Sequence, residues 1–94
     1  VYHGEWENMR PNGLGKYSYS NGNVYVGRFH KGRKNGLGTF TWGVKSRFSG
    51  NEYFGEWKND RKNGQGKQTY RNGKIEEGIW VNNKFKYSRQ PPTP

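Results

Sequence analysis

A short motif of aromatic residues and glycine recurs at a fixed interval, and this periodicity constrains the fold more than any other feature of the sequence. The pattern Tyr-x-Gly-x-Trp begins at Tyr2, returns with phenylalanine in last place at Tyr25, recurs in full at Tyr53, and begins a weakened copy at Glu76. The period is 23 residues, with five extra residues in the second copy. Such a repeat indicates supersecondary units that stack on one another.

The spacing of residues within each copy is that of β-strands. Aromatic residues stand two apart at Tyr17 and Tyr19 and again at Phe40 and Trp42, which puts them on one face of a strand. Alanine is absent and glycine is abundant, which disfavours helices. Each copy therefore predicts a β-hairpin, and consecutive hairpins predict one all-β antiparallel meander. Strands are expected near 2–8, 14–19, 24–30, 37–42, 52–58, 65–70 and 75–81.

Glycines are expected to face large rings across the hairpins. If the first hairpin closes with Asn8 opposite Gly13, Trp6 lies across from Gly15 and covers it. The same register pairs Tyr17 with Gly4, Phe29 with Gly38, Phe40 with Gly27 and Trp57 with Gly66 on that face, and Glu5 with Lys16 and Glu56 with Lys67 on the opposite, solvated face.

Two stretches, YHGEWENMRPNGLG and YFGEWKNDRKNGQG, resemble the MORN (membrane occupation and recognition nexus) repeat. The resemblance covers about residues 1–83 and recurs in register three times. It implies a curved, single-layer sheet that serves assembly or localisation and holds a partner segment against its aromatic side. The expected units are 2–24, 25–52 with an insertion near 43–50, 53–75 and a partial unit 76–87, followed by a Pro-rich tail or linker at 88–94.

Nothing in the sequence singles out an active site. The Gly-x-Gly pairs lack the Gly-Lys-Ser/Thr of a phosphate loop, cysteine is absent, and His3 and His30 occupy non-equivalent repeat positions. We therefore expect no enzyme activity, no cofactor and no metal. No apolar run approaches the roughly 18 to 20 residues that cross a bilayer. We expect a soluble, intracellular and cytoplasmic protein, with association to the cytoskeleton or a membrane left open.

Basic residues are numerous, and many fall in the segments MRPNG, GRKNG and DRKNG. The net charge of +10 favours an acidic partner, and hairpin loops would repeat about every 10 Å along one edge of the sheet. At about 1 kcal/mol per basic residue near an anionic membrane, five contacts give about 5 kcal/mol, which is weak binding. Acidic phospholipid, including phosphoinositide, is thus the alternative ligand, with candidate contacts Arg10, Arg33, Lys34, Arg61 and Lys62.

The favoured function is a non-enzymatic scaffold or interaction module that binds a partner protein segment along the aromatic face. The same rings are expected to build the sheet, so nucleic acid, which would need them for base stacking, is not expected. The unpaired edge strands of the sheet could pair with those of a second copy, so a homo-oligomer is a further alternative. The candidate partner-binding residues are Tyr2, Trp6, Tyr17, Tyr25, Phe29, Phe40, Tyr53, Trp57 and Tyr70.

Overall fold

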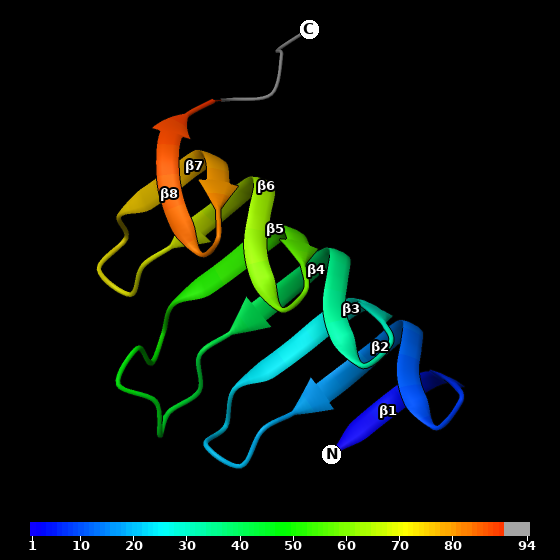
Figure 1. Cartoon of the computed structure of the whole chain (residues 1–94). Helices are drawn as coiled ribbons and strands as arrows, with labels where there is room; N and C mark the ends of the chain where they lie inside the picture. The colour runs from blue at the N-terminus through cyan, green and yellow to red at the C-terminus, as the bar shows by residue number, and fades with distance from the viewer. Residues whose placement is uncertain (90–94) are drawn as a thin grey trace, which may run out of the picture.

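The structure, a computed structural model, describes residues 1–89 and within them forms one antiparallel sheet of eight strands without a helix. The strands pair in chain order, so each strand is hydrogen-bonded to the one before it and the one after it (Figure 1). The predicted all-β hairpin meander is confirmed. The strands are β1 (Tyr2–Glu7), β2 (Arg10–Ser18), β3 (Val24–His30), β4 (Arg33–Thr41), β5 (Glu52–Lys58), β6 (Arg61–Thr69), β7 (Ile75–Val81) and β8 (Lys84–Ser88).

The hairpins close through two-residue turns, which are shorter than the loops expected from the sequence. Asn8 and Met9 have φ of 50° and 62°, and Asn59 and Asp60 have φ of 48° and 69°. Positive φ at both central residues is the type I′ geometry, whose twist matches that of the flanking strands. The segments MRPNG, GRKNG and DRKNG therefore lie mostly in strands that begin at Arg10, Arg33 and Arg61, before the predicted starts at 14, 37 and 65.

The connections between hairpins agree better with expectation. Gly22 and Gly73 take the left-handed conformation, with φ of 90° and 92°, in the connections 19–23 and 70–74. Both lie between the strands that the sequence predicted, and each is closed by a hydrogen bond from the Tyr19 or Tyr70 N–H to the carbonyl of Asn23 or Lys74. The expected insertion near 43–50 forms the longer loop between β4 and β5. The Asn23 side chain accepts a hydrogen bond from the Gly43 N–H at 2.8 Å, which ties this loop to the preceding connection.

The predicted register is wrong, because glycine lies opposite glycine in the first three hairpins, as at Gly27 and Gly38. A side chain at Gly38 would overlap the ring of Tyr25, which lies across the pair from the first strand. The glycines therefore make room for the motif's own tyrosine. The observed partners of the rings are Tyr2 for Tyr17, Pro11 for Trp6, Lys34 for Phe29, Tyr25 for Phe40 and Lys62 for Trp57.

The expected cross-strand ion pairs of Glu5 and Glu56 are also absent among residues 1–89. Lys16 lies opposite His3 and Lys67 opposite Phe54, because the register shifts at a bulge beside each glutamate. The Glu5 carboxylate instead accepts a hydrogen bond from the Leu14 N–H at 2.6 Å. Glu56 does the same for the Gln65 N–H at 2.9 Å. Each glutamate thus satisfies a backbone donor of the neighbouring strand.

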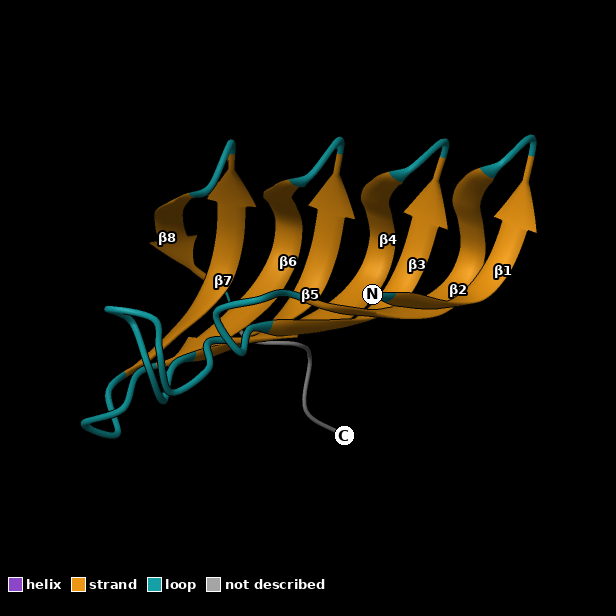
Figure 2. Cartoon of the chain, turned by 90° about the horizontal axis from the view of Figure 1, so that it is seen from below, coloured by secondary structure: helices purple, strands orange, loops and turns teal. Residues whose placement is uncertain are grey.

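The strands curve together, so the sheet is concave on one side (Figure 2). We call this concave side the trough. Residues four apart in a straight strand are separated by about 13 Å. The ring centroids of Tyr25 and Phe29 nevertheless lie 5.0 Å apart, and those of Tyr53 and Trp57 lie 5.1 Å apart. Strands that bring these rings together are concave on the aromatic side. The core of this single-layer sheet is therefore the floor of the trough.

The fourth unit is more complete than expected. It was predicted as a partial unit with no strand after residue 81, yet β8 pairs with β7 and finishes a fourth hairpin. The Pro-rich tail predicted at 88–94 lies outside the described residues from 90 onward. Ser88 ends β8, and the Arg89 N–H donates to the Glu77 carbonyl at 3.2 Å.

Candidate functional site

The trough is floored by five buried rings that contact one another from β3 to β7. Tyr25 and Tyr53 are 0% exposed, and the rings pack edge to face, for example Tyr25 on Trp57 and Tyr53 on Trp80. Edge-to-face packing matches the charge distribution of aromatic rings and adds to the gain from burial. The buried floor consists of Tyr25, Phe29, Tyr53, Trp57 and Trp80.

Half-buried rings surround this floor and leave part of the aromatic surface exposed. Of the nine predicted partner-binding residues, Tyr25, Phe29, Tyr53 and Trp57 belong to the floor. Trp6 is 58% exposed, and Tyr2, Tyr17 and Phe40 are partly covered against the core. Tyr70 lies just beyond β6, where its hydroxyl bonds to the Glu76 carboxylate.

Four further rings on this side were absent from the predicted set. Tyr19 packs on Tyr17, with ring centroids 4.6 Å apart, and Trp42 packs on Phe40, with ring centroids 4.7 Å apart. Their two-residue spacing was a usable signal. Trp80 stands in the weakened fourth motif and was also detectable. Phe85 contacts Trp80 at 5.2 Å, and only recognition of the fourth hairpin would have revealed it.

Two lysines lie inside the trough, although the sequence placed them in exposed loops. Because Lys34 and Lys62 are the second residues of β4 and β6, strand alternation directs them to the aromatic side. The Lys34 side chain is only 12% exposed. Its ammonium lies 5.3 Å from the Trp57 ring centroid and 5.4 Å from that of Phe40. These are cation–π distances.

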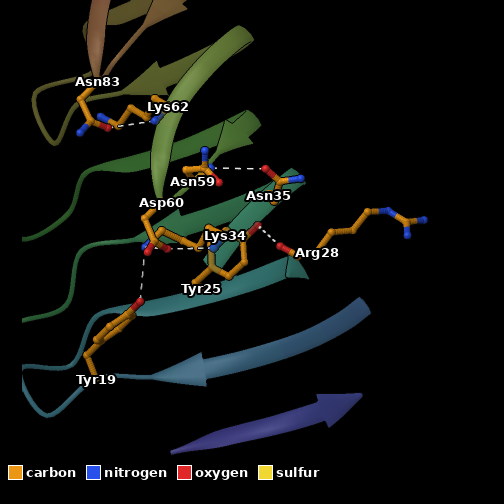
Figure 3. Close-up of polar contacts among 9 residues, drawn as sticks. All are labelled: Tyr19, Tyr25, Arg28, Lys34, Asn35, Asn59, Asp60, Lys62 and Asn83. Carbon is orange, nitrogen blue, oxygen red and sulfur yellow. Dashed lines mark hydrogen bonds and ion pairs between the residues drawn. The ribbon is translucent and has the colours of Figure 1, made fainter. Parts of the chain in front are cut away.

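Lys34 forms an ion pair with Asp60 (Figure 3). Its Nζ lies 3.5 Å from the Asp60 carboxylate, and its backbone N–H donates to the same carboxylate at 2.8 Å. Nζ also donates to the Tyr19 hydroxyl at 3.5 Å. Asp60 is the second residue of the next hairpin's turn, so this pair also joins successive repeats.

Lys62 is held differently. Its ammonium donates to the buried Gln68 side chain at 2.7 Å and lies 4.9 Å from the ring centroids of Trp42 and Trp80. Among residues 1–89, the one ion pair within 4.0 Å is Lys34 with Asp60, so Lys62 has no such carboxylate partner there. Burial lowers the pKa of Lys62 to about 8, and the negative charge of Glu76 opposes that shift.

The second residues of β2, β4, β6 and β8 form a row along the trough, and the two ends of this row are apolar. Pro11 faces Trp6 as Lys62 faces Trp57, and Phe85 faces Trp80 in the same way. Successive repeats thus place proline, lysine, lysine and phenylalanine along the trough. The positive charge of this row is confined to its middle.

The predicted basic edge is divided between the two sides of the sheet. Arg10, Arg33 and Arg61 are exposed first residues of their strands, and alternation directs them away from the trough. Arg33 and Arg61, with Lys58, line a hollow of about 390 Å³ near the turns. The five candidate lipid contacts therefore do not form one surface, because Lys34 and Lys62 lie in the trough.

This architecture defines a class: an open repeat sheet built of β-hairpins. The chain belongs to the MORN-repeat family, because the family model of the MORN repeat matches residues 2–24, 25–47 and 53–75, well over half of the sequence. MORN repeats are non-enzymatic modules that act in protein or membrane interaction. A comparison with curated proteins finds no match.

Two further observations concern the part of the chain that the structure describes. Residues 1–89 contain no helix of the length and apolarity needed to span a membrane. They also contain no group of three or more His, Cys, Asp or Glu side chains placed to hold a metal ion.

Proposed function

We propose that this chain is a scaffold module that holds a segment of a partner protein in the trough. The observation that carries the proposal is a hollow of about 270 Å³ on the aromatic side, where partly exposed rings meet both lysines. Hollows lined by aromatic side chains with a few polar groups are typical recognition sites. The hollow is lined by Lys34, Phe40, Trp42, Trp57, Asp60, Lys62 and Asn83.

Eight of the nine predicted residues divide into two roles under this proposal, Trp42 joins them as an addition, and Tyr70, bonded to Glu76, has neither role. Tyr25, Phe29, Tyr53 and Trp57 shape the floor, so their truncation lowers stability before it lowers binding. Phe40 and Trp42 offer partly exposed ring surface beside the hollow, and Trp6 offers it at the end of the trough. These accessible rings, together with Tyr2 and Tyr17, are the contact residues.

Affinity capture with two single-ring variants tests this function. Trp42→Ala removes a ring of the trough, whereas Phe54→Ala removes a ring that is 53% exposed on the opposite face. We expect a partner that crosslinks to the parent chain and to Phe54→Ala, with capture reduced about tenfold or more by Trp42→Ala. A partner whose capture depends on Phe54 and not on Trp42 would refute the proposal. Circular dichroism confirms that both variants fold.

Contact with an acidic membrane is a second candidate function, supported by the hollow that Arg33, Lys58 and Arg61 share. Vesicle flotation at low salt tests it with matched charge reversals. Arg33→Glu combined with Arg61→Glu should abolish binding to acidic vesicles. Lys45→Glu with Arg47→Glu changes the net charge equally in the β4–β5 loop and should retain it. Equal loss in both variants would show a general charge effect, and no flotation of the parent chain would remove this candidate.

A further inference from the structure

The Lys62 ammonium is the least compensated charge of the trough. An ammonium has three N–H donors, and the structure gives one of them a partner, the Gln68 oxygen at 2.7 Å. The rings of Trp42, Tyr53 and Trp80 surround it at 4.9 to 5.2 Å. A partly desolvated cation in such surroundings gains most from an anionic partner, because low local polarity strengthens the attraction.

The other charges nearby limit what that partner can be. Lys34 already has Asp60 at 3.5 Å, and the Glu76 carboxylate lies near enough to oppose the shift in the pKa of Lys62. A nucleic acid or another polyanion presents phosphates in succession and would meet these carboxylates. The trough suits one negative charge better than a row of them.

The ends of the trough specify what flanks that charge. Toward β1 lie Pro11 and the 58% exposed Trp6, and toward β8 lies Phe85 on Trp80. One repeat spans two strands, or about 10 Å, and an extended chain covers that distance in about three residues. An occupant that crosses the trough thus reaches Phe85 one repeat, or about three residues, beyond Lys62. On the other side it meets the rings of Phe40 and Trp42 beside the hollow, and it reaches Pro11 and Trp6 only after two repeats, or about six residues.

We propose that the segment bound in the trough carries one aspartate or glutamate that pairs with Lys62 and has apolar residues on both sides of it. This inference rests on the proposed function and specifies the chemistry of the partner. The carboxylate accepts hydrogen bonds from the remaining N–H groups of Lys62. The apolar residues on either side of it in the segment pack on Trp42 and on the rings beside Phe85.

Selection from a display library of random twelve-residue peptides tests the inference. The library is panned on the whole parent chain, on Lys62→Met and on Lys67→Met. Lys67 lies on the same strand but faces Phe54 on the outer side, so it is the matched control. Methionine keeps the unbranched apolar stem and removes the ammonium, with its charge and its hydrogen bond to Gln68. Thermal unfolding confirms that all three proteins are folded.

We expect peptides from the parent chain and from Lys67→Met to share one acidic position between apolar ones. Lys62→Met should lose that acidic preference while it keeps the apolar positions. A selected peptide should bind Lys62→Met about 10- to 100-fold more weakly, the range of a lost charge-assisted hydrogen bond. An unchanged consensus on Lys62→Met, or one without an acid on the parent chain, would overturn the inference.

The same experiment distinguishes failure of the proposed function from failure of the inference about Lys62. If selected peptides are insensitive to Trp42→Ala, or if the parent chain selects none, the trough is not a peptide-binding surface and both proposals fall. If they require Trp42 but show no acidic position, only the inference about Lys62 falls. Binding of a single-stranded oligonucleotide that displaces the peptide and depends equally on Lys62 would also overturn it.

Discussion

At the residue scale, polar side chains of the repeat mainly serve the backbone. Asn12, Asn35 and Asn63 each accept a hydrogen bond from a backbone N–H in the turn of the next hairpin, at 3.1 to 3.4 Å. Glu5 and Glu56 accept from the neighbouring strand. Open sheets have no second layer to cover such groups, so these side chains complete the hydrogen bonding. The asparagine and glutamate of the motif are therefore structural.

The second repeat lacks one of these carboxylates, because Arg28 occupies the position of Glu5 and Glu56. We expect Arg28→Glu to raise the free energy of unfolding by about 0.5–1.5 kcal/mol, since the new carboxylate can accept the Leu37 N–H. Urea denaturation measures the change. Arg33→Glu serves as the control, because it changes the net charge by the same amount but does not place a carboxylate at the position that can accept the Leu37 N–H. Equal stabilisation by both substitutions would attribute the gain to reduced charge repulsion instead.

Lys62 makes stability depend on pH in a particular direction. The unfolded chain keeps this proton up to the ordinary pKa of 10.5, whereas the folded chain releases it near pH 8. Between these values the unfolded state binds more protons, so stability rises with pH. Burial raises the pKa of Tyr25 and Tyr53, so above about pH 10 these phenols ionise in the unfolded chain and stability falls.

Lys62→Met should therefore stabilise the chain at pH 7, and it should reduce the increase in the free energy of unfolding between pH 8 and pH 10. We expect a gain of about 1 kcal/mol, less than the full pKa shift would imply, because the side chain is partly solvated. Urea denaturation at pH 7 and pH 9.5 measures both effects, with Lys67→Met as the control. A variant less stable than the parent at pH 7 would show that the rings and the hydrogen bond to Gln68 together favour the ammonium more than burial opposes it.

At the element scale, the sequence was sufficient for the first three hairpins, but not for the second strand of the fourth or for the register within the hairpins. Period-two rings and the Tyr-x-Gly-x-Trp motif identify strands. The observed register opposes Gly27 to Gly38, and the Tyr25 ring covers the pair diagonally, which a direct-pair rule cannot anticipate. The Asn-Met and Asn-Asp turns were missed because neither carries the usual glycine. With longer loops assumed, Lys34 and Lys62 were assigned to the surface.

Gly38 tests the observed register. A methyl group there overlaps the Tyr25 ring, so Gly38→Ala should destabilise the chain by about 1–3 kcal/mol. In a Tyr25→Leu background the overlap is relieved, and the added cost of Gly38→Ala should nearly vanish. Chemical denaturation of the two single variants and the double variant completes the cycle. Additive losses would mean that the tyrosine does not cover this glycine.

At the scale of the whole molecule, the sheet is a linear array in which each strand is hydrogen-bonded only to its neighbours and the rings reach no further than the next repeat. Its buried floor lies between β3 and β7, whereas Trp6 on β1 and Phe85 on β8 are partly open. Stability in such arrays is the sum of units and their interfaces, so the ends open first.

Native-state hydrogen exchange should therefore find the slowest amides in β4 and β5, with protection that declines toward β1 and β8. The measurement needs only the purified chain at several denaturant concentrations. Uniform protection from β1 to β8 would mean that the sheet opens as one cooperative unit, which contradicts the array description.

The central claim is that a partner segment occupies the trough. All four tryptophans lie on that side, and Trp57 and Trp80 already donate their indole N–H groups to the carbonyls of Gly38 and Gly66. A ¹H–¹⁵N spectrum recorded while a peptide selected on the parent chain is added tests the claim most directly. We expect the indole signals of Trp6 and Trp42 to shift, while the backbone signals of Val26 and Lys67 on the outer face stay in place. Shifts confined to the outer face, with unchanged indole signals, would contradict it.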